Sequence, residues 1–178
     1  YEGHAGPVNS VSFSPDGSEL LTGSDDGTLR RWNTFSGEEL SGLSGHADAV
    51  SSVAFSPDGL IMASGSADTK VKLWDRAYED GSTSMREHTD VVHSLAVSPD
   101  GLRIVSAAWN ARVHLWESDT LLSLTALDLP LEGTAMVAFS PDGDQIAAGM
   151  ISADRDQPNP IYFFDSSSHD MLMDLPIV

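Results

Sequence analysis

The sequence predicts an all-β fold built from four repeated, four-stranded antiparallel sheets, and three observations support this prediction. The string Ser-Pro-Asp-Gly begins at Ser14, Ser56, Ser98 and Ser140, so it recurs every 42 residues. Two other residue types keep this spacing in the first three units only: Trp32, Trp74 and Trp116, and His4, His46 and His88. Short runs of Val, Leu and Phe alternate with Ser, Gly and Asp, which is typical of a turn-rich β protein.

The period divides the chain into four units, which are residues 3–44, 45–86, 87–128 and 129–178. In the divergent fourth unit Phe164 stands where the others have tryptophan, and it follows Trp116 by 48 residues instead of 42. We therefore expect an insertion of six residues between Gly149 and Ile161.

Each unit reads as four short strands. In the second unit, 50–55 is a strand, Ser-Pro-Asp-Gly is a type I turn, and 61–65 and 70–74 are the next two strands. A fourth strand is expected before the next histidine. Small residues such as Ser52 and Ala54 separate the large ones in the first strand. This pattern indicates that the first strand is an inner one, covered on both faces by neighbouring sheets.

Three stretches of the second unit closely resemble the WD-repeat family: Gly45-His46, then Ser64-Gly65-Ser66-Ala67-Asp68, and then Leu73-Trp74-Asp75. The resemblance covers nearly the whole chain and is weakest in the fourth unit, where Pro130 takes the histidine position and Ala148 the serine position. It implies that each unit is a blade of a β-propeller. The four blades are then half of an eight-bladed ring or part of a larger propeller.

A histidine, a serine or threonine, and an aspartate could indicate a hydrolase. The set recurs in three units, however, whereas catalysis needs a single site. The resemblance implies instead a buried hydrogen-bonded network that joins the strands of each blade. Its expected members are His4, Thr22, Asp26 and Trp32; His46, Ser64, Asp68 and Trp74; and His88, Ser106, Asn110 and Trp116. His114, on a third strand, is expected to be solvated.

Positions that differ between units are the candidates for function. The resemblance implies that residues flanking the first valine of strand one, and the residue before the turn aspartate, line one end of the ring and contact partners. These positions are Pro7, Asn9 and Asp25; Ala49, Ser51 and Ala67; Val91, His93 and Trp109; and Gly133, Ala135 and Ile151. Among them and the insertion, we expect partner contacts from Trp109, His93, Val91, Asn9, Asp25, Ser51, Ile151 and Arg155.

Trp109 is the strongest of these candidates, because an exposed indole is a rigid amphipathic anchor at interfaces. Its alternative role is local packing against its own turn. The expected function is a non-catalytic interaction scaffold that binds a peptide or protein loop. The alternative is a lectin-like propeller that holds a small ligand or sugar, but equivalent pockets should then repeat their residues, and Trp109 corresponds to Asp25 and Ala67.

Composition limits the partners further. The net charge is −18, with 9 Lys and Arg against 27 Asp and Glu, which argues against nucleic acids and anionic membranes as partners. Asp154-Arg155-Asp156 begins like a calcium loop, but Pro158 occupies the next ligand position. We therefore expect no metal and no cofactor. No apolar run approaches the length of a membrane span, and the expected location is cytoplasmic.

Four blades fall short of the seven that usually close a ring of this family. The two terminal blades are therefore expected to expose large apolar faces, which a monomer tolerates poorly. A second copy, giving a dimer with eight blades, would cover them. Further blades of a longer parent protein are the alternative.

Overall fold

The structure, a computed structural model, describes residues 3–77, 82–130, 133–152, 154 and 159–175. Within these residues all regular elements are β-strands, and they form four four-stranded antiparallel sheets, which confirms the predicted fold class. We call the sheets blades 1 to 4. Blade 1 contains β1 (Val8–Phe13), β2 (Glu19–Ser24), β3 (Thr28–Asn33) and β4 (Glu39–Ser44). Blade 2 contains β5 (Val50–Phe55), β6 (Ile61–Ser66), β7 (Val71–Asp75) and β8 (Ser82–Met85).

The other two blades repeat this order. Blade 3 contains β9 (Val92–Val97), β10 (Arg103–Ala108), β11 (Arg112–Glu117) and β12 (Ser123–Asp128). Blade 4 contains β13 (Gly133–Phe139), β14 (Gln145–Ser152), β15 (Ile161–Asp165) and β16 (Met171–Leu175). In every blade the spatial order of the strands is the chain order, so each blade is a simple meander.

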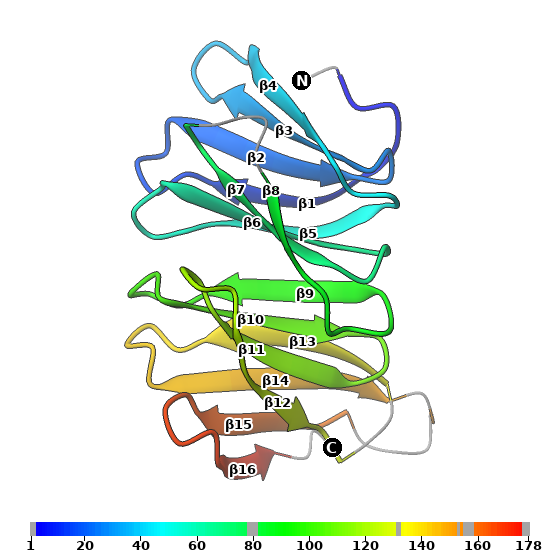
Figure 1. Ribbon diagram of the computed structural model, residues 1–178, viewed down its shortest axis with the longest axis vertical. Helices are drawn as coiled ribbons and strands as arrows, with labels where there is room; N and C mark the ends of the chain where they lie inside the picture. Colours follow the sequence, from blue (N-terminus) through cyan, green and yellow to red (C-terminus); the bar gives the residue numbers. More distant parts are fainter. Residues whose placement is uncertain (1–2, 78–81, 131–132, 153, 155–158, 176–178) are drawn as a thin grey trace.

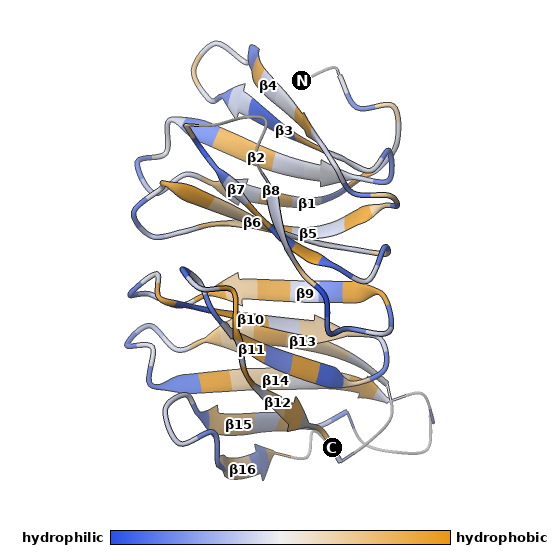
Figure 2. Ribbon diagram, viewed as in Figure 1, coloured by the Kyte–Doolittle hydropathy of each residue, from blue (hydrophilic) through white to orange (hydrophobic). Residues whose placement is uncertain are grey.

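The blades stack face to face in chain order, from blade 1 in blue to blade 4 in orange and red (Figure 1). The first strands of successive blades contact one another, with β1 against β5, β5 against β9 and β9 against β13. An apolar cluster fills each of the three junctions between blades. Figure 2 shows hydrophobic segments on β6 and β9, which face each other across the junction of blades 2 and 3. Burial of these faces is the main force that holds the stack together.

The Ser-Pro-Asp-Gly turns fix the first hairpin of each blade. In blade 1, the hydroxyl of Ser14 donates to Asp16 at 2.7 Å and also accepts the N–H of Glu19 at 2.9 Å. Gly17 has a φ of 70°, a conformation that glycine adopts without steric cost, and its N–H donates to Ser14 O at 2.8 Å. The same serine–aspartate bond recurs in the other three turns.

The terminal blades differ from the inner ones in burial. Val50 and Phe55 on β5 are 0% and 8% exposed, whereas Val8 and Phe13 at the matching positions of β1 are 49% and 65% exposed. The first strand of blade 1 is therefore not covered on both faces, as the sequence predicts for a terminal blade, because no described strand packs against its outer face. Among the described residues, no helix is long and apolar enough to span a membrane.

Candidate partner-binding end of the blades

One end of each blade brings together the start of the first strand and the turn between the second and third strands. We call this the variable end. Backbone hydrogen bonds hold the two segments side by side in blades 1 to 3: Asp25 N to Pro7 O at 2.9 Å, Ala67 N to Ala49 O at 2.9 Å, and Trp109 N to Val91 O at 3.0 Å. The positions that vary between units therefore lie next to each other within each blade.

Trp109 presents a large apolar surface at the variable end. Its indole is 51% exposed, and its ring centroid lies 6.2 Å from that of His93 at an interplanar angle of 49°. The two residues come from different strand ends, Trp109 from the turn after β10 and His93 from β9. The indole therefore rests against a neighbouring ring while half of its surface faces solvent, and Val91 beside them is half-buried.

Two other candidate residues join adjacent blades. The amide of Asn9 donates to Asp25 at 2.7 Å and to Val50 O of blade 2 at 3.0 Å. The hydroxyl of Ser51 is within hydrogen-bond distance of Gly65 O and of Val92 O of blade 3. The polar atoms of Asn9 and Ser51 thus have structural partners, which leaves less of them for a ligand.

The candidates of blade 4 are placed differently. Ile151 is 58% exposed, at the end of β14. Ala135, which the repeat maps to the same end, is 0% exposed, so it cannot contact a partner; β13 turns this side chain into the core shared with blade 3. Arg155 lies outside the described residues, as do residues 153 and 156–158 of the same segment.

Sequence reasoning missed two acidic residues at this end. The carboxylate of Asp48 accepts the N–H of Ala49 at 2.8 Å, and that of Asp90 accepts the N–H of Val91 at 2.7 Å. Both precede a first strand, and they lie 42 residues apart, so the repeat itself was the signal that could have found them. Asp90 thus places a carboxylate beside Val91, whose carbonyl accepts the N–H of Trp109.

The expected network is complete in blade 2. Trp74 Nε1 donates to Ser64 Oγ at 2.8 Å, Ser64 Oγ lies 2.7 Å from His46 Nε2, and His46 Nδ1 lies 3.0 Å from Asp68 Oδ2. Burial alone would raise the pKa of Asp68, but hydrogen bonds from Ala47 N–H and His46 hold that pKa below its ordinary value. Ser64 is 0% exposed, so its hydroxyl is closed off from any substrate.

Blade 1 contains the same arrangement, with threonine in place of serine. His4 lies 2.7 Å from Thr22 Oγ1 and 3.0 Å from Asp26 Oδ2, and Trp32 Nε1 donates to Thr22 at 2.9 Å. The aspartate also accepts the N–H of Ala5 at 2.8 Å, which ties the segment before β1 to the turn after β2. Such networks favour one geometry because an unsatisfied buried polar group costs about 1 to 3 kcal/mol.

Blade 3 departs from this pattern. His88 and Trp116 both bond Ser106, at 2.7 and 2.8 Å, but Asn110 does not reach the histidine. Its amide donates to Thr89 at 3.1 Å instead, so the expected place of Asn110 in the network is wrong.

His114 packs against the histidine of the blade 3 network. Its ring meets that of His88 edge-on, with centroids 4.6 Å apart, and its Nδ1 lies 3.4 Å from Glu87 Oε2. His114 is 4% exposed, so the expectation that it is solvated is also wrong. No cluster of three or more potential metal ligands occurs in the described part of the chain.

Comparison with known proteins gives short, strong matches. The chain is 55% identical over 38 residues to the serine-threonine kinase receptor-associated protein of Homo sapiens, which is 21% of this chain and 11% of that protein. It is 60% identical over 37 residues to WD repeat-containing protein 38 of Homo sapiens, and 52% identical over 40 residues to ribosome biogenesis protein ERB1 of Yarrowia lipolytica. These two matches cover 21% and 22% of this chain, and 12% and 5% of the respective relatives.

A family model gives the broader result. The model described as "WD domain, G-beta repeat" matches residues 1–33, 37–75 and 81–117, which together are more than half of the chain. The three matches fall on blades 1 to 3, where the histidine, the serine or threonine, and the tryptophan recur in the same geometry. With its four meander sheets stacked face to face, the chain belongs to the WD40 repeat family.

Proposed function

We propose that this chain is a non-catalytic interaction module that binds a peptide or protein loop at the variable end of its blades. The half-exposed indole of Trp109 against His93 is the observation that carries the proposal. Partly exposed tryptophans on a rigid support are enriched among residues that dominate binding energy. Positions that correspond to Trp109 hold Asp25, Ala67 and Ile151, so a ligand would meet one apolar anchor and not four equal pockets.

The experiment is a peptide-display selection against the chain, followed by titration of the selected peptides with Trp109→Ala. We expect the substitution to weaken binding at least about 30-fold, the equivalent of the usual 2 kcal/mol threshold for a dominant contact. Phe35→Ala is the matched control, because Phe35 is 90% exposed and lies in the β3–β4 turn. Equal loss in both variants, or unchanged binding by Trp109→Ala, would refute the proposal. Saturable binding of a free sugar by the chain would support the lectin-like alternative.

We also propose that a second copy of the chain covers the exposed outer faces of blades 1 and 4. At two of the three inner junctions a valine fits over a glycine: a Cβ added to Gly23 would lie 2.6 Å from Val50, and one added to Gly65 would lie 2.6 Å from Val92. At the free faces the matching residues are Gly149, with nothing within 4 Å of an added Cβ, and Val8, which is 49% exposed. This valine and this glycine support the pairing of the two free faces.

Sedimentation across a range of salt concentrations tests this pairing. Two chains of net charge −18 repel each other, so we expect a dimer whose association tightens as salt rises from about 50 to 500 mM. Val8→Asp should weaken the dimer by placing a charge in the apolar contact, whereas Leu60→Asp, on an exposed turn residue away from both faces, should not. A stable monomer at all salt concentrations contradicts the proposal.

A further inference from the structure

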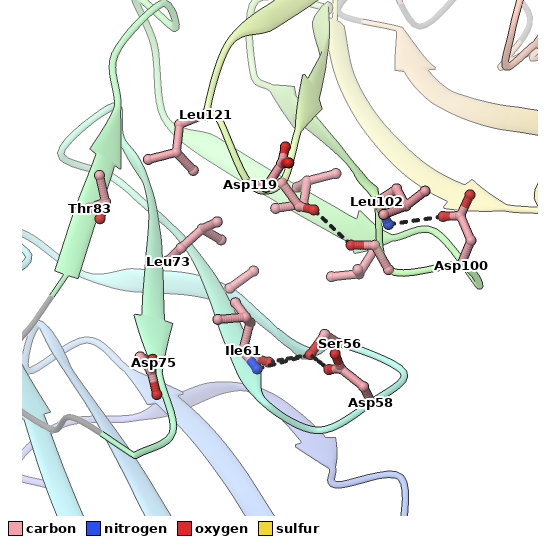
Figure 3. A pocket seen from close by; sticks show the side chains of 15 residues that line it. Ser56, Asp58, Ile61, Leu73, Asp75, Thr83, Asp100, Leu102, Asp119 and Leu121 are labelled. Carbon is pink, nitrogen blue, oxygen red and sulfur yellow. Dashed lines mark hydrogen bonds between the residues drawn. The ribbon is translucent and has the colours of Figure 1, made fainter.

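A cavity of about 490 Å³ opens between blades 2 and 3, at the end formed by the Ser-Pro-Asp-Gly turns and so opposite to the variable end. Figure 3 shows Ile61, Leu73 and Leu121 lining its interior. Four carboxylates surround this apolar interior, and they belong to Asp58, Asp75, Asp100 and Asp119. Of the described residues that line the cavity, none is Lys, Arg or His.

The junction of blades 1 and 2 contains charged side chains at the corresponding positions. Glu19 and Arg31, 42 residues before Ile61 and Leu73, form a two-pronged ion pair with both N···O distances at 2.9 Å. Arg31 also donates to Arg76 O of blade 2 at 3.3 Å, and Arg76 Nη2 donates back to Glu19 at 2.8 Å. Guanidinium groups of the chain itself therefore fill this junction.

The junction of blades 3 and 4 contains an arginine as well. Arg103 stands at the position of Ile61, and its guanidinium donates to Ser166 O at 2.7 Å and to Gly143 O at 3.4 Å. The same group lies 6.0 Å from the centroid of the Phe139 ring, within the range of a cation–π contact. At both neighbouring junctions, then, an arginine of one blade binds backbone carbonyls of the next blade.

At the junction of blades 2 and 3 the arginine is replaced by apolar residues, while the acceptors stay. Ser118 O and Gly101 O correspond to the two carbonyls that Arg103 binds in blade 4. Arg76 follows Asp75 in the chain, but its guanidinium donates to Glu19 of blade 1 and to the carbonyl of Gly59. Arg103 is directed to blade 4, with only a 3.8 Å approach to Asp100. The acidic rim therefore has little compensating positive charge from the chain.

Two of the rim carboxylates are held ionised by their own turns. A hydrogen bond from the Ser56 hydroxyl, then one from Leu60 N–H, lowers the pKa of Asp58 below its ordinary value. A hydrogen bond from the Ser98 hydroxyl, then one from Leu102 N–H, does the same for Asp100. The rim is thus negatively charged over the whole neutral pH range.

We propose that this cavity is a docking site for an arginine side chain of a partner polypeptide. The aliphatic part of the arginine would lie on Ile61 and Leu73, and its guanidinium would meet the carboxylates of Asp75 and Asp119 and the carbonyl of Ser118. A guanidinium is planar and weakly hydrated, so it tolerates a partly apolar site better than the ammonium of lysine. The inference goes beyond the proposed function, because it concerns the opposite end of the blades and does not depend on Trp109.

The test uses a blocked tripeptide, acetyl-Leu-Arg-Leu-amide, titrated into the whole chain while methyl NMR signals are followed. We expect shifts of the methyl groups of Ile61, Leu73 and Ile104, and no shift at Val8 on the free face of blade 1. Replacing the arginine of the tripeptide by citrulline, which has the same shape and no charge, should weaken binding at least about tenfold. Equal binding of the citrulline peptide overturns the proposal.

Two variants of the chain sharpen the test. Ile61→Arg places in blade 2 the arginine that blade 3 has at position 103, so it should fill the cavity, abolish the shifts and keep the fold. Asp119→Asn keeps the full cavity and should weaken binding, whereas Asp144→Asn, an exposed residue of blade 4, makes the same charge change elsewhere and should not. Continued binding by a folded Ile61→Arg variant, or equal weakening by both asparagine variants, shows that the peptide is attracted only by the overall negative charge.

Discussion

Blades 2 and 3 are built on the same repeat, but the third partner of their buried histidine differs. In blade 2, His46 lies between Ser64 and the carboxylate of Asp68. In blade 3, His88 keeps the serine bond, and its ring meets that of His114 edge-on. Its Nδ1 is buried, and among the described residues nothing forms a hydrogen bond with it. The strands of both blades nevertheless keep the same pairing.

The difference separates two roles of the network. The serine and tryptophan, present in both blades, hold the second and third strands at a fixed distance from the segment before the first strand. The aspartate controls which charge the histidine can carry, because a carboxylate favours the protonated ring whereas burial disfavours it. Blade 3 therefore keeps the serine and the tryptophan of the network. It lacks the aspartate, which would stabilise a positive charge on the histidine.

The largest expected effect on stability comes from the tryptophan that bonds the buried serine, a feature that the two blades share. Trp74→Ala and Trp116→Ala should each lower the free energy of unfolding by about 3 to 5 kcal/mol, because both indoles are 2% exposed and bond a buried serine. Urea denaturation at neutral pH measures both. If Trp116→Ala lowers the free energy of unfolding much less than Trp74→Ala does, the network of blade 3 contributes less to stability than that of blade 2. The two blades then do not share an equivalent serine and tryptophan contact.

A smaller effect should distinguish the blades by pH. Burial, and then the neighbouring His114, lowers the pKa of His88 to about 3. Between an ordinary histidine pKa near 6.5 and that value, the unfolded chain binds a proton that the folded chain does not. The free energy of unfolding should therefore fall as the pH falls, by up to about 1.4 kcal/mol per pH unit between about pH 6 and 4.5.

Urea denaturation at several pH values measures this slope. The His88→Gln variant is the control, since glutamine fills a similar space and does not titrate. Burial also lowers the pKa of His46, against the opposing effect of Asp68, so the variant should keep part of the slope. An identical slope in the variant would show that His88 does not cause the acid sensitivity.

The sequence was sufficient for the features that repeat. The 42-residue period predicted four repeated sheets. The family resemblance implied the bonded chain of His46, Ser64 and Trp74, which recurs because a repeated backbone brings repeated residues to equivalent places. The departures of single blades were not accessible in this way. Asn110 can replace aspartate in a pattern without taking its bonds, since its amide donates to Thr89 instead. The contact between the rings of His114 and His88 is likewise encoded by no local motif.

The candidate site shows the same limit. The family resemblance mapped Trp109 and Val91 to the same end of the blade, and a backbone hydrogen bond joins them there. It could not show that Asn9 and Ser51 reach across to the next blade, or that Ala135 is buried, because these outcomes depend on how neighbouring blades pack. The cavity between blades 2 and 3 was also invisible, since it results from apolar residues at positions where the adjoining junctions have arginine.

An intermediate effect should follow from exchanging the third partner between the blades. Asn110→Asp offers a carboxylate to His88 and should raise the free energy of unfolding at neutral pH by about 1 kcal/mol, while flattening its acid dependence. In blade 2, Asp68→Asn should lower the free energy of unfolding at neutral pH by about 1 to 3 kcal/mol and make its acid dependence steeper, because it weakens the bonds from His46 and Ala47. Destabilisation by both substitutions would mean that the blades are not interchangeable at this position.

The smallest effect on stability is expected at the variable end, where Trp109 belongs to blade 3 but not to its network. Its indole is 51% exposed and contacts His93, so Trp109→Ala removes little buried surface and should change the free energy of unfolding by no more than about 0.5 kcal/mol. Thermal melts of Trp109→Ala beside Trp116→Ala, from the same blade, measure the contrast directly. If both variants have the same lowered melting temperature, Trp109 is part of the blade core. The proposed binding surface then loses its main apolar contact.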